Sequence, residues 1–233
     1  MSLDNEWASY DWLSDARTLV KWVNDLDSPS LIIIRHSERL VNLSPSDTLK
    51  AELTQVGHQM AIEFGRRLST NKQITILHSP NIRTTQTAER ISEGVLDAGG
   101  SIIRKEKLDI LWGLESDYSK FASLLSEYGF SEVYSRWINE QIPDEVFEPI
   151  DHFFERFLPH TLGRLSKAEP NSLEIHVTHD LVIDIAQRKF LGINMESDYF
   201  DIPFLGGLGF VKTEGAVQGY HRQEYYPLAF DYP

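Results

Sequence analysis

The sequence predicts an α/β fold: a three-layer α/β/α sandwich with a mostly parallel central sheet and a helical insert that caps the carboxyl ends of the strands. Short apolar runs alternate with amphipathic helical patterns along most of the chain, an order typical of parallel sheets covered by helices. Three of these runs end in polar clusters, Arg35-His36, His78-Ser79 and His179-Asp180. Because open α/β sheets bind ligands outside the carboxyl ends of their strands, the clusters are candidates for a single site.

The first predicted strand, residues 31–35, is the one on which the rest of the interpretation depends. It begins with four consecutive aliphatic residues, three of them β-branched, which suits a strand buried on both faces. Before it, apolar residues recur at helical spacing over 11–26, so we expect a helix that covers one face of the sheet. After it, residues 40–53 are rich in turn-forming residues and predict an exposed loop.

The next part of the chain repeats this pattern of helix and strand. Thr54 is a suitable N-cap for a one-sided helix that runs to about residue 68. A second apolar strand follows at 74–77, and another helix begins near Asn81 and stops at Gly99-Gly100. Residues 101–103 predict a third strand.

The region 104–170 differs from the rest because it contains several helical patterns but no strong strand. We interpret it as an insert within one domain, 1–233, rather than as a separate domain. Beyond it we expect a strand at 172–177, a helix at 181–191 and a last strand at 208–212. The large aromatic residues of the insert are expected to form its core rather than a platform for substrate: Trp112, Trp137, Phe153, Phe154 and Phe157.

Composition excludes several classes of protein. The 233 residues include no cysteine, which excludes disulfides, thiolate metal sites and a cysteine nucleophile, and fits a reducing compartment. The net charge is −13, so we expect repulsion from nucleic acid and from anionic membranes. The sequence shows neither a secretory signal nor a membrane-spanning run. These features predict a soluble, cytoplasmic protein, and they leave its oligomeric state open.

The cluster after the first strand suits phosphate chemistry. Arg35 and Arg39 lie on either side of His36 in the sequence. Two guanidinium groups can hold a dianionic phosphate in bidentate fashion while an imidazole attacks phosphorus. The alternative is a strand end with solvated charges, in which the two arginines pair with Glu38 and Glu52.

Four blocks of sequence occur in the order and spacing of a known family. They are Arg35-His36-x-x-Arg39, Leu53-Thr54-x-x-Gly57, Ser79-Pro80-x-x-Arg83-Thr84 and His179-Asp180. Together they resemble the signature of the histidine phosphatase superfamily, the phosphoglycerate mutase and acid phosphatase group. The resemblance covers residues 31–191 and leaves the N-terminal helix, most of the insert and the tail without a counterpart.

The resemblance implies a role for each matching residue. His36 would be the nucleophile and carry a phosphohistidine intermediate. Arg35, Arg39 and Arg83 would bind the phosphoryl oxygens, and His179 would add a further donor. The same resemblance implies no metal and no other cofactor, because the arginines neutralise the phosphate charge. The substrate would be a small phosphorylated molecule or a phosphoprotein.

The general acid is less well determined. The acid phosphatase branch of the family places an aspartate directly after the second histidine, and Asp180 matches it. The mutase-like branch uses a carboxylate after the third strand, for which Asp109 and Glu115 are rivals, and an asparagine that Asn42 matches. We prefer Asp180, because its place beside the second histidine does not depend on the insert.

Ser37 is a departure from the family, which usually has glycine at this position. A serine there would strain the loop or add a hydroxyl contact, so Ser37 and Asn42 are candidate pocket residues. The departure motivates a non-catalytic alternative, a degenerate protein that binds phosphorylated ligands.

Two further alternatives concern the reaction itself. A mutase would pass the phosphoryl group back to substrate rather than to water. A metal-dependent phosphohydrolase could be suggested by His176-x-x-His179-Asp180, but this run ends a β-rich segment, whereas that class places its ligands on helices. We expect specificity to be set by the 104–170 insert and the 40–52 loop.

Overall fold

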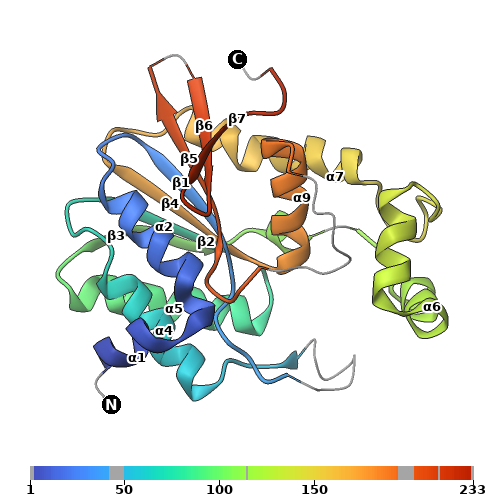
Figure 1. Ribbon diagram of the computed structural model, residues 1–233, viewed down its shortest axis with the longest axis horizontal. Helices are drawn as coiled ribbons and strands as arrows, with labels where there is room; N and C mark the ends of the chain where they lie inside the picture. Colours follow the sequence, from blue (N-terminus) through green and yellow to red (C-terminus); the bar gives the residue numbers. More distant parts are fainter. Residues whose placement is uncertain (1–2, 42–49, 114, 194–201, 215, 232–233) are drawn as a thin grey trace.

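The computed structural model describes residues 3–41, 50–113, 115–193, 202–214 and 216–231. Within these ranges a seven-stranded sheet forms the centre of the molecule (Figure 1). Its strands are β1 (Ser30–Arg35), β2 (Gln73–His78), β3 (Ser101–Lys107), β4 (Ser172–Thr178), β5 (Gly207–Thr213), β6 (Ala216–His221) and β7 (Glu224–Pro227). The α/β fold and the places of β1 to β5 agree with the pattern of apolar runs.

The sheet is parallel in its core and antiparallel at one side. The strand order is β3-β2-β4-β1-β5-β6-β7. β1 and β2 each pair with β4 in parallel, and β2 also pairs with β3 in parallel. β5, β6 and β7 extend the sheet beyond β1 as an antiparallel meander. The prediction of a mostly parallel sheet is therefore confirmed for β1 to β4, which include the three strands that carry the polar clusters.

Helices cover both faces of the sheet, which gives three layers. The first helical layer consists of α1 (Leu3–Ser9), η1 (Asp11–Leu13), α2 (Ser14–Asn24), α4 (Gln55–Arg66) and α5 (Ile82–Asp97). The second is built around α9 (Asp180–Leu191) (Figure 1). Alternate side chains of β1 enter the two cores: Ile32 and Ile34 face the first layer, and Leu31 and Ile33 face the second. This period of two explains why the strand is apolar throughout.

Local signals at the helix ends have the expected partners. Thr54 Oγ1 accepts a hydrogen bond from the Gly57 amide at 2.9 Å at the start of α4, and the Asn81 side chain caps α5. Gly192 ends α9 in the left-handed region, with φ of 66°, which glycine adopts at little cost. These caps satisfy groups that a helix end would otherwise leave unpaired.

The insert begins later than predicted, because β3 continues to Lys107. It consists of η2 (Asp109–Trp112), α6 (Tyr118–Ile138), α7 (Ile150–Phe157), η3 (Leu158–His160) and α8 (Leu162–Leu165). α7 packs against α9, where Phe154 and Phe190 lie 5.0 Å apart edge to face. α6 projects away from the sheet (Figure 1). Trp137, Phe153 and Phe157 are buried, as expected of core residues, but Trp112 is exposed, so the prediction for Trp112 was wrong.

The C-terminal part of the sheet was not predicted. The strand expected at 208–212 is β5 rather than the last strand, because β6 and β7 follow it. The turn between β6 and β7 contains Arg222 and Gln223, both with positive φ. Such hairpin turns usually carry asparagine or glycine, and without them the tail gave no hairpin signal.

Candidate active site

The polar clusters meet at the carboxyl edge of the parallel strands. His36, Ser79 and His179 directly follow β1, β2 and β4, and these three strands are neighbours in the sheet. The His36 amide donates to the Thr178 carbonyl at 3.0 Å. The Ser79 amide donates to the Val177 carbonyl at 3.1 Å. The strand ends are therefore held side by side where the site residues emerge.

Arg83 joins the two histidines. Its Nε donates to His36 Nε2 at 3.0 Å, and its Nη2 lies 3.2 Å from His179 Nδ1. Its Nη1 donates to Asn81 Oδ1 at 3.0 Å, the same oxygen that caps α5. Asn81 thus positions the guanidinium as well as the helix. His36, Arg83 and His179 are all buried.

The hydrogen bonds assign one tautomer to each histidine. His36 Nδ1 donates to the Ser37 carbonyl at 2.8 Å, so its Nε2 carries the lone pair that Arg83 contacts. His179 Nδ1 accepts from Arg83, so its Nε2 donates to Ser79 Oγ at 2.9 Å. Ser79 Oγ in turn lies 2.8 Å from Thr84 Oγ1. The network is consistent with two neutral imidazoles.

The electrostatics favour the same protonation states. Burial lowers the pKa of His36 well below its ordinary 6.5, and the charges of His179, Arg83 and Arg35 lower it further. Burial is also the main cause that lowers the pKa of His179, followed by the charge of Arg83, while Asp180 opposes the shift. A neutral His36 is the form in which Nε2 can act as a nucleophile.

Arg35 and Arg39 extend the positive side of the site. Arg35 pairs with Asp180 at 2.8 Å, donates to the Ile202 carbonyl at 2.6 Å and stacks over the Phe204 ring at 4.4 Å. Arg39 donates to the carbonyl of the next residue. Burial, followed by the charge of Arg35, lowers the pKa of Arg39. Within the described part of the chain, Nε of both arginines is buried without a hydrogen-bond partner.

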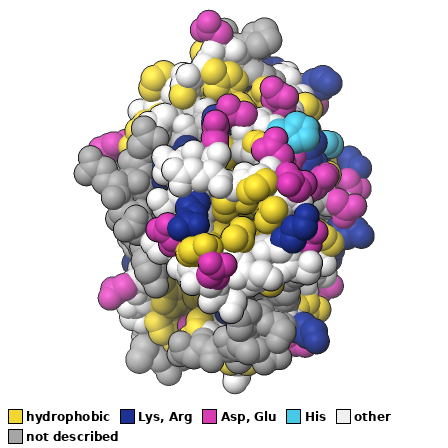
Figure 2. All heavy atoms as spheres, turned by 90° about the vertical axis from the view of Figure 1, so that its right-hand side faces the viewer, with side chains coloured by type: hydrophobic (Ala, Val, Ile, Leu, Met, Phe, Trp, Pro, Cys, Tyr) yellow, Lys and Arg dark blue, Asp and Glu magenta, His cyan; other side chains and the backbone are white. Residues whose placement is uncertain are grey.

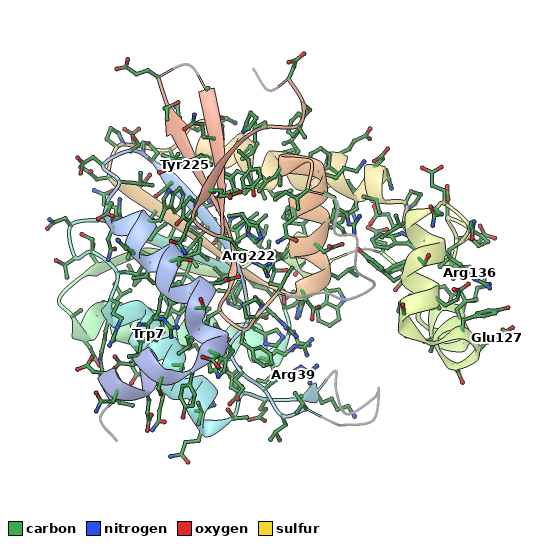
Figure 3. The ribbon with its side chains drawn as sticks, in the orientation of Figure 1. Trp7, Arg39, Glu127, Arg136, Arg222 and Tyr225 are labelled. Carbon is green, nitrogen blue, oxygen red and sulfur yellow. The ribbon has the colours of Figure 1, made fainter. Side chains whose placement is uncertain are left out.

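Arg39 lies at the carboxyl end of β1, away from the α6 residues Glu127 and Arg136 (Figure 3). The phosphate-binding candidates therefore gather at the sheet edge and not on the projecting helix.

Ser37 is accommodated by the scaffold. Its hydroxyl donates to the Gly57 carbonyl at 2.7 Å, and its amide donates to Thr87 Oγ1 at 2.9 Å. Its φ is not positive, so the strain considered for a non-glycine residue does not arise. The side chain of this candidate pocket residue is directed at the start of α4 instead. A Cβ on Gly57 would lie 2.1 Å from the Glu38 carbonyl oxygen, which shows how closely α4 approaches the loop.

The three candidate acids occupy different positions. Asp180 contacts Arg35, whereas the side chain of Asp109 is 81% exposed and lies 3.7 Å from Lys107. The side chain of Glu115 is 79% exposed and faces Arg156. Of the three, only Asp180 has a recorded contact with the arginine and histidine cluster. Asn42 lies outside the described residues.

The solvated-charge alternative does not describe this strand end. Glu38 accepts a hydrogen bond from Thr54, and Glu52 accepts one from Gln86 at 3.1 Å. Arg35 pairs with Asp180 instead of either glutamate.

The histidines considered for a metal site also have separate partners. His176 Nε2 lies 2.6 Å from Glu174 Oε1, whereas His179 contacts Arg83 and Ser79. Across the ranges that the structure describes, no group of three or more potential metal-ligating side chains is found.

Two aromatic contacts at the site were not expected from the sequence. The Trp112 and His179 rings meet edge to face at 5.1 Å. The Phe204 ring lies 5.7 Å from that of His36. Neither residue belongs to one of the four sequence blocks that resemble the family. The sequence therefore gave no signal that would have placed them at the site.

Comparison with known proteins gives a family model that matches residues 31–205 and is described as the histidine phosphatase superfamily (branch 1). A search of curated proteins gave no match. In the described part of the chain, no helix is long and apolar enough to cross a membrane.

Several solved structures share the fold. A protein described as mycobacterial hydrolase 2 has a TM-score of 0.57 and 16% identity, over 88% of this chain and 94% of its own. Mycobacterial glucosyl-3-phosphoglycerate phosphatase has a TM-score of 0.54 and 16% identity, over 83% of this chain and 91% of its own. The structure of the same enzyme in complex with VO3 has a TM-score of 0.55 and 15% identity, over 84% of this chain and 99% of its own. At these identities the likeness concerns the fold alone.

Proposed function

The chain belongs to the histidine phosphatase superfamily, and we propose that it is a metal-independent phosphatase that hydrolyses a phosphomonoester through a phosphohistidine on His36. The observation that carries the proposal is the bonding of His36. Its Nδ1 is fixed by the Ser37 carbonyl, while its Nε2 lone pair faces the guanidinium of Arg83. A nucleophile and an anion-binding group therefore face each other.

Substrate binding would use the arginines at the sheet edge. Phosphate oxygens that approach His36 Nε2 would take over the hydrogen bond that Arg83 now donates to it. Arg35 and Arg39 have buried Nε atoms with no partner among the described residues, and these can serve the same anion. Three guanidiniums and the His179 side chain would then surround the phosphoryl group and stabilise its charge during transfer.

The first chemical step would be attack of His36 Nε2 on phosphorus. A P–N bond forms while the P–O bond to the substrate alcohol breaks, and the alkoxide takes a proton from a general acid. In the second step water attacks phosphorus, the P–N bond breaks, and the proton of the water returns to the conjugate base. The products are the alcohol and inorganic phosphate.

We assign the acid to Asp180, because its carboxylate already contacts the cluster through Arg35. When phosphate binds Arg35, this ion pair can open and release the carboxyl group toward the leaving oxygen. Asp109 and Glu115 stay as rivals, since η2 brings Trp112 against His179 and Asp109 begins the same short helix.

The first test compares two histidine variants. His36→Ala should lower kcat for p-nitrophenyl phosphate by at least about 10⁴-fold, because the step that forms the intermediate is lost. His160→Ala, at an exposed position in η3, is the matched control and should keep the parent rate. Full activity of His36→Ala would rule out the mechanism.

The other functions predict different outcomes in the same assays. A mutase would convert phosphoglycerates to isomers in preference to releasing phosphate. A non-catalytic protein would bind phosphate with no turnover of any ester. The non-catalytic alternative was motivated by Ser37, whose hydroxyl and backbone fit the loop without strain.

A further inference from the structure

The surroundings of Trp112 indicate which kind of leaving group the site accepts. Its ring contacts His179 on one side, and its side chain also lines a hollow of about 540 Å³ together with Asp109, Gly113 and Glu115. This volume lies in the range of small-molecule sites. Trp112 is therefore the side chain that links this hollow to His179.

Some of the exposed apolar side chains lie next to site residues. Among the described residues, eight large hydrophobic side chains are exposed: Leu40, Val41, Ile82, Leu96, Ile103, Trp112, Tyr128 and Tyr225. Leu40 and Val41 follow Arg39, Ile82 precedes Arg83, and Trp112 contacts His179. Single exposed apolar residues are ordinary, but a group of them next to a charged pocket is typical of a binding surface.

A second aromatic side chain contacts the other histidine of the cluster. Phe204 is half-buried beside His36 and Arg35, and its ring meets Trp12 edge to face at 6.0 Å. Trp12 stacks on Tyr10. Phe204 thus contacts His36, as Trp112 contacts His179.

The charges beside Trp112 disfavour an anionic leaving group. Asp109 and Glu115 are exposed in the hollow, and its Arg156 is already held by Glu148 at 2.7 Å. A neighbouring hollow of about 600 Å³ is lined mainly by acidic residues, among them Asp117 and Asp144. The face of the molecule shown in Figure 2 carries many acidic side chains, with lysine and arginine side chains among them.

We propose that the substrate alcohol is an uncharged group with an aromatic or apolar surface, which packs against Trp112 in this hollow. The proposal rests on the proposed phosphatase function and narrows its substrate class. Such a group would bury the exposed indole, whereas a carboxylate or second phosphate would face Asp109 and Glu115.

Three phosphate esters of alcohols test this preference: benzyl phosphate, glycerol 3-phosphate and 3-phosphoglycerate. The expected order of kcat/KM is benzyl, then glycerol, then glycerate. Benzyl phosphate should exceed glycerol 3-phosphate by roughly 10- to 100-fold, the range for filling an apolar subsite. A preference for either of the other two esters would overturn the proposal.

Variants separate a specificity role from a structural one. Trp112→Ala should lower kcat/KM for benzyl phosphate by roughly 10-fold and change that for glycerol 3-phosphate little, and Trp112→Phe should restore most of the loss. Tyr128→Ala, at an equally exposed aromatic position on α6, should leave both substrates unchanged. An equal loss on all three esters in Trp112→Ala would assign the residue to positioning His179 and contradict the proposal.

Binding to His36→Ala gives a readout that needs no turnover. By calorimetry, benzyl phosphate should bind this variant roughly 10-fold more tightly than glycerol 3-phosphate. Equal affinities would overturn the assignment of the subsite. If no ester is hydrolysed by the parent protein but benzyl phosphate still binds preferentially, the phosphatase function fails and the apolar subsite stands.

Discussion

The two ends of the candidate active site are built differently. At the phosphate end, His36, Arg83 and His179 are buried, and each imidazole nitrogen has a hydrogen-bond partner. At the leaving-group end, Asp109 and Trp112 are exposed, and the ion pair of Asp109 with Lys107 is long, at 3.7 Å. The phosphate end is fixed by the scaffold, whereas the leaving-group end is free to differ without disturbing the core.

The difference follows from the elements that supply each end. The phosphate end comes from three adjacent strand ends and the first turn of α5. These positions are set by strand register and by the Asn81 cap. The leaving-group end comes from η2 and the chain after it, which packs mainly through Leu111 and its contact with Thr178. Substitutions at the two ends should therefore have different consequences.

After His36 itself, the largest expected effect at the phosphate end concerns Arg83. Arg83→Ala should lower kcat/KM for p-nitrophenyl phosphate by about 10³-fold, because a preorganised donor to the transferring phosphoryl group is lost. Arg83→Lys should recover only part of this loss, since an ammonium cannot reach both histidines as the planar fork does. Arg90→Ala, on the same helix, should have the parent rate. A loss of less than tenfold in Arg83→Ala would contradict the role.

Two glycines compare the tolerance of the scaffold with that of the insert. Gly57→Ala places a Cβ 2.1 Å from the Glu38 carbonyl oxygen, so we expect a loss of about 3 kcal/mol in the free energy of unfolding. Gly163→Ala, in α8, places a Cβ 3.5 Å from the Leu158 carbonyl oxygen, which is an ordinary contact distance. This substitution should stabilise the protein by up to about 1 kcal/mol. Urea denaturation measures the free energy of unfolding of both variants. Similar changes in the two variants would contradict the expected difference between the scaffold and the insert.

The identity of the general acid can be tested by comparing Asp180, at the phosphate end, with Asp109, at the leaving-group end. Asp180→Asn should slow alkyl phosphates, which have poor leaving groups, by about 10²-fold and aryl phosphates much less. Asp109→Asn is the parallel variant at the exposed end. If Asp109→Asn shows this dependence on the leaving group and Asp180→Asn slows all esters equally, the acid belongs to the insert and Asp180 serves to hold Arg35.

The last expected effect is on stability as pH falls. Burial lowers the pKa of His36 and of His179 below 6.5, so the unfolded chain binds more protons than the folded one below that pH. The free energy of unfolding should therefore decrease from pH 7 to pH 5, by about 1–2 kcal/mol for each histidine. His179→Gln should flatten this dependence, and His160→Gln, at an exposed position, should not.

Much of the phosphate end could be predicted from the sequence. Apolar runs located the strands, and the polar residues directly after them located His36 and His179, because parallel strands place their carboxyl ends together. The block that contains Arg83 predicted a phosphate-binding arginine near the start of a helix. What the sequence did not contain was the side-chain network, such as the bond from Arg83 to both histidines, which depends on rotamers and on Asn81.

The leaving-group end was harder to predict for a physical reason. Trp112 was assigned to the core because large aromatic residues are usually buried, yet it ends the short helix η2 and is exposed. Phe204 lies in the sequence between the predicted helix at 181–191 and the predicted strand at 208–212. Its contact with His36 arises from the tertiary structure. The β6–β7 hairpin was missed because its turn lacks the usual residues. These features depend on tertiary contacts rather than on a local pattern.

The most direct test of the central claim is to trap the covalent intermediate. Protein mixed with an aryl phosphate and quenched within the first turnover in alkali, where phosphohistidine survives, should carry one phosphoryl group on the peptide that contains His36. The label should be absent from His36→Ala. Turnover without any labelled peptide, or a label on another residue, would contradict the proposed mechanism.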